Sequence, residues 1–522
     1  MNENKTGNSK RQKFYITTAI PYMNAKLHLG QVYEFILADV IARYHRLIGY
    51  DVFFLTGSDE HGAKIFKTAA SKGISQQEYV DGMVGDMKRI LKLYNISNDA
   101  FIRTTDPLHE KIVQDIYTKL NENGDIYKST YEGSYCVPCE TFFSDNQLID
   151  KKCPQCSRDV DWIEEDNYFF RLSKYEDKLI EHIEKNPDFV VPQTRKNEVL
   201  GLLKQGLKDF SISRTTVKWG VQIPFDASHY SYVWIDALIN YISALGYGSS
   251  DDTLYLKYWP ADQHHIGKDI LKFHTVIWPA LLMSLGVKLP EHVVIHGWIM
   301  KGEEKLSKSK GITLDPDEMS DQYGSDAIRY FFTREISFGL DGSFTAESMQ
   351  KRYNAELSND YGNLVSRTIA MIGKYREGII PPATSGDPGL KKQWLMSREN
   401  AINAIKNWDY AGCLISIWEF INMANKYIED SRPWELAKGS GKDDAEKLDN
   451  VLYSLAESIR LATILVFPFM PDSCAKVYTQ LGIEINPEDI ILEEHGCWGF
   501  FKGSAKTGAR EILFPRIESD KD

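Results

Sequence analysis

The first hundred or so residues constrain the fold most, because predicted strands and helices alternate there with short turns between them. Residues 14–20 are β-branched and aromatic, which is typical of a strand, and the apolar residues from 28 to 46 recur at helical spacing. Further strands and helices are expected at 51–56, 61–72, 78–94, 100–105 and 109–122. Alternation at this pitch predicts an α/β fold with a parallel sheet.

The alternation stops in the middle of the chain and gives way to helices towards its end. Residues from about 125 to 230 contain clustered cysteines and irregular turns, and the alternation resumes at 232–236 and again near 255–300. Residues 293–300 are expected to form a buried strand. From about 345 onward the patterns are almost entirely helical. The sequence therefore predicts a domain inserted into the α/β fold, followed by a helical bundle.

Composition excludes several classes of protein. A chain of 522 residues corresponds to roughly three or four domains, and 43% hydrophobic with 26% charged residues is typical of a soluble globular protein. The net charge of −12 argues against indiscriminate nucleic-acid binding, although a local basic face stays open. The apolar stretches are too short to cross a bilayer and the polar start lacks a secretory signal, so we expect a cytoplasmic protein without a membrane partner.

Four of the seven cysteines form two C-x-x-C pairs. Seven cysteines are too few for a disulfide scaffold in a chain of this length, and paired thiols in a reducing compartment indicate a metal. Four thiolates complete a tetrahedral site and leave no open position, so the pattern predicts one structural Zn²⁺. The predicted ligands are Cys136, Cys139, Cys153 and Cys156.

Two segments carry residues suited to phosphate. The turn at 19–31, which reads AIPYMNAKLHLGQ, brings His28 and Gly30 to a helix N-terminus, where unpaired N–H groups and the helix dipole attract anions. The loop at 301–311, which reads KGEEKLSKSKG, offers Lys305 and Lys308 to a triphosphate. Alone, each segment has a simpler interpretation, namely a hydrogen-bonded histidine in a turn and a solvated charged loop.

Together, the two segments resemble the HIGH and KMSKS signatures of class I aminoacyl-tRNA synthetases. From about residue 14 to about 480 the chain is similar to the methionine-specific family of these enzymes, with further matching stretches at 19–22, 56–62, 232–241, 265–270 and 296–298. The resemblance implies activation of L-methionine with ATP and Mg²⁺ to methionyl-adenylate, and transfer to the 3′ end of methionine tRNA with release of AMP and pyrophosphate. One position departs from the pattern, because Gln31 stands where the signature ends in histidine.

The resemblance also implies a division of the chain into functional parts. It predicts a Rossmann-type parallel-sheet catalytic domain split by a zinc-knuckle insertion near the tRNA acceptor end, and an α-helical anticodon-binding bundle. The expected parts are a polar tail at 1–13, the first half of the catalytic domain at 14–120, the connective-peptide insertion at 121–230, the second half at 231–302, the signature loop and stem-contact linker at 303–357, and the anticodon-binding domain at 358–522.

The same resemblance assigns roles to individual residues. Asp59 is expected to bind the methionine ammonium, and the thioether is expected to meet a wall of Ile20, Tyr22, Trp234, Ala237, Tyr241 and His296. The ATP site is expected to contain His28, Gly30, Gly267, Asp269 and Lys308, and the catalytic groups are expected to be His28, Gln31, Lys305 and Lys308. Asn363, Arg367 and Trp434 match positions that read the CAU anticodon. Taken singly, Trp234, Tyr241 and Trp434 are more often core aromatics, and Asn363 with Arg367 is more often a solvated helix face.

Two other functions stay open. Another class I synthetase for an apolar amino acid normally needs a large editing insertion, because one methylene is worth only about 1–3 kcal/mol of discrimination, and an insertion of about 105 residues is short for that role. A non-catalytic tRNA-binding relative is the second alternative, with Gln31 as its only support. Since no strand-rich module follows residue 490, we expect a monomer.

Overall fold

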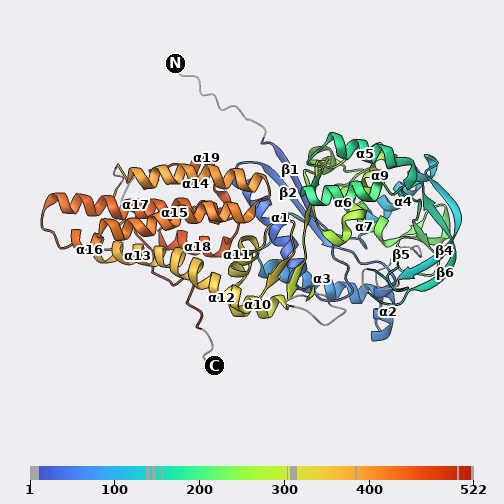
Figure 1. The fold of residues 1–522 in the computed structure, drawn as a ribbon, viewed down its shortest axis with the longest axis horizontal. Coiled ribbons are helices and arrows are strands. Elements are labelled where there is room, and N and C mark those ends of the chain that lie inside the picture. The colour runs from blue at the N-terminus through green and yellow to red at the C-terminus, as the bar shows by residue number, and fades with distance from the viewer. Residues whose placement is uncertain are drawn as a thin grey trace, which may run out of the picture.

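The molecule is elongated, with an α/β region at one end and a helical bundle at the other (Figure 1). The computed structural model describes residues 11–136, 141–143, 148–154, 157–301, 304–305, 314–382, 385–501 and 505–518, although the side chains of 131, 141–143, 301 and 304–305 are not described. Within these ranges, every helix is too short or too polar to span a membrane.

A six-stranded parallel sheet forms the centre of the α/β region, in the order β3-β2-β1-β12-β13-β7. Its first strands and helices confirm the alternation predicted from the sequence, with ends displaced by a few residues. The strands are β1 (Lys13–Thr18), β2 (Asp51–Ser58), β3 (Ala100–Arg103), β7 (Val190–Val191), β12 (Gln263–Gly267) and β13 (His292–His296). The helices are α1 (Leu29–Leu47), α2 (Ala63–Lys72), α3 (Gln76–Leu93), α4 (Pro107–Glu122), α7 (Val233–Ser243), α8 (Thr253–Tyr258) and α9 (Trp278–Leu285).

The predicted strand at 293–300 is two strands in the structure. β13 ends at His296, and β14 (Ile299–Lys301) pairs instead with β16 (Gly342–Phe344). The break falls at Gly297, where a Cβ atom would lie 2.1 Å from the carbonyl oxygen of Leu340. Only glycine allows this close approach of the two backbones. The segment at 232–236, where we expected the alternation to resume, is the beginning of helix α7.

The segment between α4 and α7 contains two antiparallel sheets of its own, as well as helices. One sheet has the order β5-β4-β6-β8 and a smaller one the order β10-β11-β9. β7, however, pairs in parallel with β13, so this segment also supplies the edge strand of the central sheet. Its elements are β4 (Ile126–Cys136), β5 (Thr141–Phe143), β6 (Asp161–Phe170), η2 (Leu172–Tyr175), α5 (Glu176–Lys185), α6 (Gln193–Leu203), β8 (Phe210–Ser211), β9 (Ser213–Arg214), β10 (Gln222–Ile223) and β11 (Asp226–Ser231).

A short linker region connects the α/β region to the bundle, which is helical as predicted (Figure 1). The linker contains β15 (Glu304–Lys305), α10 (Pro316–Tyr323), α11 (Ser325–Glu335), α12 (Ala346–Arg352) and the π-helix η6 (Tyr353–Gly362). The bundle contains α13 (Asn363–Arg376), α14 (Pro388–Lys406), α15 (Tyr410–Ser431), α16 (Pro433–Leu436), α17 (Lys442–Val466), α18 (Pro471–Gln480) and α19 (Leu492–His495). α14 and α15 carry buried residues at helical spacing, which explains why the sequence alone predicted them well. In α17 every residue from 451 to 466 is buried, as in a helix at the centre of a bundle.

A buried ionic cluster joins the α/β region, the linker and the bundle. Asp39 on α1 accepts hydrogen bonds from Arg43 Nε (2.8 Å) and from Arg329 on α11 (2.7 Å), and all three residues are buried. The guanidinium of Arg329 also donates to the carbonyl oxygens of Pro468 and Phe469, which follow α17. α1 begins at the predicted phosphate site, and this cluster ties that helix to the bundle.

Candidate active site

A cavity of about 350 Å³ opens at the carboxyl ends of β1 and β12. The two strands are neighbours in the sheet although about 250 residues separate them in the sequence, and such a topological switch point is where open α/β sheets bind ligands. Its size is typical of a small-molecule site. The cavity brings together twelve of the predicted site residues, namely Ile20, Tyr22, His28, Gly30, Gln31, Asp59, Trp234, Ala237, Tyr241, Gly267, Asp269 and His296.

The turn before α1 is held by a reciprocal pair of hydrogen bonds. The Nδ1 atom of His28 accepts from the Gly30 N–H at 3.1 Å, and Oε1 of Gln31 accepts from the His28 N–H at 3.2 Å. A capping box satisfies backbone donors. The Leu29 and Gln31 N–H groups also donate to the carbonyls of Leu314 and His28, so the first N–H groups of α1, which the sequence predicted to be unpaired, are already bonded. The side chains of His28 and Gln31 nevertheless line the cavity. Because Nδ1 is an acceptor, the proton of a neutral His28 ring resides on Nε2, and the amide NH₂ of Gln31 is its remaining donor group. Both residues can therefore donate hydrogen bonds to an anion.

The predicted ammonium partner, Asp59, is held in place from both sides. Its backbone accepts from Met23 N–H (2.9 Å) and donates to the Pro21 carbonyl (3.0 Å). The next residue, Glu60, is buried and accepts a bidentate pair from Arg103 at 2.7 and 2.8 Å. Gly57, two residues before Asp59, has no room for a side chain, since a Cβ atom would lie 2.2 Å from the Ile102 carbonyl oxygen. These contacts fix the backbone that carries the Asp59 carboxylate to the cavity.

Aromatic rings from two helical segments line the other end of the cavity. Trp234 stacks on Phe273 with ring centroids 3.8 Å apart and planes 11° from parallel. Tyr241 OH and His274 Nε2 lie 2.8 Å apart, and His274 Nδ1 lies 3.1 Å from the Ile270 carbonyl. Burial lowers the pKa of His274 to about 4, so its neutral ring donates from Nδ1 and accepts the Tyr241 proton at Nε2.

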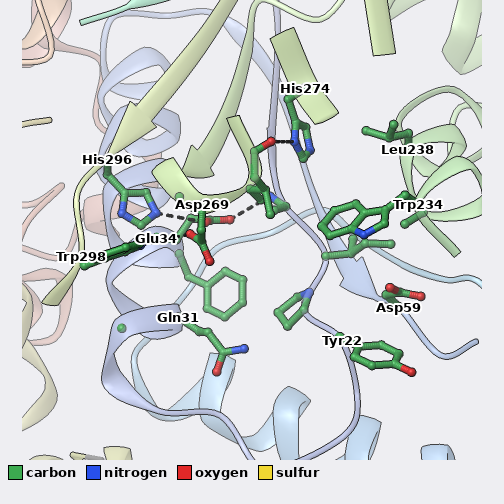
Figure 2. A pocket seen from close by; sticks show the side chains of 18 of the residues that line it. Tyr22, Gln31, Glu34, Asp59, Trp234, Leu238, Asp269, His274, His296 and Trp298 are labelled. Carbon is green, nitrogen blue, oxygen red and sulfur yellow. Dashed lines mark hydrogen bonds and ion pairs between the residues drawn. The ribbon is translucent and has the colours of Figure 1, made fainter. Parts of the chain in front are cut away.

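His274 is a site residue that the sequence reasoning missed. Ile270 and His274 are four apart, so a helical turn after the matched stretch 265–270 was a signal that could have revealed the histidine. Figure 2 shows His274, Trp234 and Leu238 on one side of the cavity and His296, Glu34 and Asp269 on the other. His296 therefore lies apart from the aromatic end, and its predicted role in the side-chain wall stays a prediction.

Glu34 is a second residue that the sequence reasoning missed. Its Oε1 accepts from the Ala19 N–H at 2.8 Å, and its Oε2 lies 3.0 Å from Nε2 of His296 (Figure 2). Burial raises the pKa of Glu34, against the opposing effect of His296. Glu34 follows Gln31 by three residues and so shares its face of α1, which was the available sequence signal.

The remaining predicted residues lie partly outside the described ranges. Cys136 and Cys153 are buried together with Leu148 and Val160 in a small apolar cluster, whereas Cys139 and Cys156 are outside these ranges, as is Lys308. Lys305 ends β15, but its side chain is not described. The described residues contain no cluster that could bind a metal ion. Two neighbouring buried thiols nevertheless fit a four-thiolate site.

The residues predicted to read the anticodon lie on the helical bundle, in the part of the chain that follows the cavity residues. Asn363 is exposed at the start of α13, and Trp434 is half-buried on α16. Arg367 on α13 pairs with Glu429 near the end of α15 at 2.7 Å. That ion pair links the helix of Asn363 and Arg367 to the segment directly before Trp434.

The parallel sheet, the histidine–glycine turn at the start of α1 and the cavity between β1 and β12 define a class I aminoacyl-tRNA synthetase. The family model of tRNA synthetases class I (M) matches residues 14–161 and 157–369. The methionine–tRNA ligase of Caldanaerobacter subterraneus subsp. tengcongensis is 49% identical, with 98% of this chain and 80% of its own length covered. The chain belongs to the methionine–tRNA ligase family.

Other relatives agree. The methionine–tRNA ligase of Thermotoga maritima is 46% identical, with 97% of this chain and 81% of its own length covered. The solved structure of Mycobacterium tuberculosis methionyl-tRNA synthetase in complex with methionyl-adenylate is similar to this fold, with a TM-score of 0.92 and 39% identity. The match covers 97% of this chain and all of that chain.

Proposed function

We propose that this protein activates L-methionine with ATP and transfers it to the 3′ end of methionine tRNA. The main support is that a single cavity contains a carboxylate on a fixed backbone, a wall of aromatic side chains and the N-terminus of a helix. Asp59 binds the substrate ammonium through a charge-assisted hydrogen bond. The thioether lies against the rings of Trp234 and Tyr241, which suits a polarizable sulfur. This orientation leaves the methionine carboxylate facing the nucleotide side of the cavity.

The nucleotide side positions ATP for the first reaction. His28 and Gln31 donate to the phosphates at the N-terminus of α1, and Gly30, Gly267 and Asp269 hold the rest of the nucleotide, with Mg²⁺ bound to the phosphates. The methionine carboxylate attacks the α-phosphorus, forming methionyl-adenylate as the bond to pyrophosphate breaks. Lys305 and Lys308 stabilise the charge that develops on the leaving group. The protein contributes positioning and electrostatics rather than covalent chemistry.

The second reaction uses the other parts of the chain. The terminal ribose hydroxyl of methionine tRNA attacks the carbonyl carbon of the adenylate, and AMP leaves. We propose that Asn363 and Arg367 bond the base edges of the CAU anticodon while Trp434 stacks on one base, which is worth roughly 1–3 kcal/mol. The Arg367–Glu429 pair supports this proposal by linking the two segments. Because the reaction supplies translation, we place it in the cytoplasm; the oligomeric state stays a prediction, testable by sedimentation.

We also propose that Cys136, Cys139, Cys153 and Cys156 hold one structural Zn²⁺. The burial of Cys136 and Cys153 in one cluster supports this assignment. The ion would crosslink two short segments of the insertion, and binding free energies of roughly 10–16 kcal/mol in comparable sites would be ample to fold them. A closed four-thiolate site takes no part in the reaction itself.

Methionine-dependent ATP–pyrophosphate exchange, run against all standard amino acids, tests the proposed function. Exchange with methionine alone is expected. An Asp59→Asn variant, which removes the charge but keeps the size, is expected to lose most of this exchange, while Asp115→Asn on the exposed face of α4 serves as the matched control. Binding of tRNA without any exchange would instead support the non-catalytic alternative, and exchange with another amino acid would refute the pocket assignment.

A further inference from the structure

A buried polar cluster lies directly behind the wall of the cavity. Its centre is Asp236 on α7, whose carboxylate oxygens each face one imidazole. His61 Nδ1 lies 2.6 Å from Oδ2, and His109 Nε2 lies 2.8 Å from Oδ1. All three residues are buried, and His109 also contacts Ser243 at 2.7 Å. The proposed reaction uses none of these side chains.

The cluster connects the loop that carries Asp59, the proposed partner of the methionine ammonium, to helix α7, which carries the aromatic residues proposed to contact the thioether. His61 lies two residues after Asp59, in the loop between β2 and α2. Asp236 lies on α7 between Trp234 and Ala237, which line the cavity. Figure 2 shows Asp59 and Trp234 on the same side of the cavity, on separate elements. The distance between the ammonium partner and the aromatic end therefore depends on how this loop docks on α7.

Charge strengthens the docking contact. Burial alone would raise the pKa of Asp236, but His61 and His109 outweigh it and lower the pKa to about 2. In return, Asp236 overcomes the burial of His61 and raises the pKa of that imidazole. Two more carboxylates face His61, with Glu110 on α4 at 3.7 Å from Nε2 and Glu60 next to it in the chain. The ring of Trp219 packs edge-on against His61, which keeps water away.

We propose that Asp236 is a positioning residue, which clamps the Asp59 loop to α7 through His61 and so sets the methionine-binding geometry of the cavity. The inference rests on the proposed function and deepens it, because it assigns methionine affinity to a residue that does not line the cavity. A rigid supporting layer of this kind is what holds binding groups to within fractions of an ångström. ATP binding, which uses the α1 side of the cavity, should not depend on this clamp.

The test is steady-state ATP–pyrophosphate exchange with wild type and Asp236→Asn, which keeps the side-chain volume but removes the charge. We expect KM for methionine to rise at least tenfold, with KM for ATP and kcat changed less than threefold, the signature of lost substrate binding. Asp125→Asn is the matched control, because Asp125 is also a buried carboxylate with several partners but lies at the insertion. It should change KM for methionine less than twofold.

The pH dependence separates positioning from a general loss of stability. In wild type the clamp weakens as His61 loses its proton, so the ratio of the variant to the wild-type methionine KM should narrow from pH 6 to pH 9. Titration of the methionine ammonium affects both proteins and cancels in this ratio. A ratio that stays constant over this range, or a folded Asp236→Asn with a methionine KM within twofold of wild type, overturns the inference.

A second variant keeps the inference testable if Asp236→Asn does not fold. His61→Gln can still donate one hydrogen bond to Asp236 but has no charge, and it should raise KM for methionine in the same direction. An unchanged KM in folded His61→Gln would contradict the clamp. If the wild-type protein exchanges with methionine and both variants have the wild-type KM for methionine, this inference alone is wrong. If the wild-type protein shows no methionine exchange, the proposed function is wrong as well.

Discussion

Replacing Asp39 by asparagine should destabilise the whole molecule, because this carboxylate is the centre of the cluster that joins α1, α11 and the bundle. Its Oδ2 accepts from Arg43 and Arg329, and its Oδ1 accepts from both the N–H and the hydroxyl of Ser97 at 2.7 and 2.6 Å. Asparagine has the same shape but no charge, and its NH₂ group cannot accept from either side. The buried guanidinium groups would then lose their neutralising partner.

The pKa of Asp39 gives the order of magnitude of the effect. Burial alone would raise this pKa, but Arg43 and Arg329 outweigh it and lower the pKa from 3.8 to about 2. A tenfold change in proton affinity is worth about 1.4 kcal/mol, so the ionised carboxylate contributes on the order of 2 kcal/mol at neutral pH. Because the folded-state pKa is the lower one, this contribution is complete above about pH 5 and falls by roughly half at pH 3.

Urea unfolding of wild type and Asp39→Asn, followed by circular dichroism and tryptophan fluorescence, measures the difference in free energy of unfolding. We expect a loss of about 2–4 kcal/mol at pH 7 and a smaller loss at pH 3. Asp115→Asn is the control, since its ion pair with Lys111 is exposed and should contribute less than about 0.5 kcal/mol. A loss below about 1 kcal/mol at pH 7, or one that does not change with pH, would refute this reasoning.

Three further outcomes are expected. Tyr241→Phe removes the hydroxyl that donates to Nε2 of His274, which should lower the free energy of unfolding by about 1–2 kcal/mol. In the exchange assay this variant should have a several-fold higher KM for methionine and an unchanged KM for ATP. Gln31→His should increase the exchange rate at pH values where the new imidazole is charged, and an unchanged rate at every pH would show that this position does not contact the transition state. Metal analysis should find one Zn²⁺ per chain, and chelation should make residues 136–156 sensitive to proteolysis while the bundle stays resistant; equal resistance with and without metal would contradict a structural zinc site.

Much of the catalytic fold could be predicted from the sequence because it depends on local patterns. The alternation at 14–122 arises from short-range hydrophobic periodicity and turn residues, and the structure confirms it. The interruption between β13 and β14 at Gly297 could not be predicted, because it depends on the close approach of Leu340, which lies more than forty residues away in the chain. The edge strand β7 was also missed, since two residues within an insertion carry no strand pattern.

Some residues of the candidate site could likewise be predicted from the sequence, and others could not. Sequence signatures predicted His28, Asp59 and Trp234, and the cavity contains all three. Glu34 was missed although it lies one helical turn from the predicted residue Gln31, and His274 was missed although it lies one turn after the matched stretch 265–270. The sequence motifs do not show which face of a helix lines the cavity. Asp236 lies within a matched stretch, but nothing in that stretch reveals that two distant histidines converge on it.

By itself, the sequence determined the elements, their order and the chemistry of the signature residues, because propensity, periodicity and motif spacing act over a few residues. Only the tertiary structure decided which side chains meet. The neighbours β1 and β12, the pair of Glu34 and His296, and the cluster around Asp39 all join groups more than two hundred residues apart. Such contacts depend on how whole elements pack, and each polar group in them is stable only when its distant partner is buried beside it.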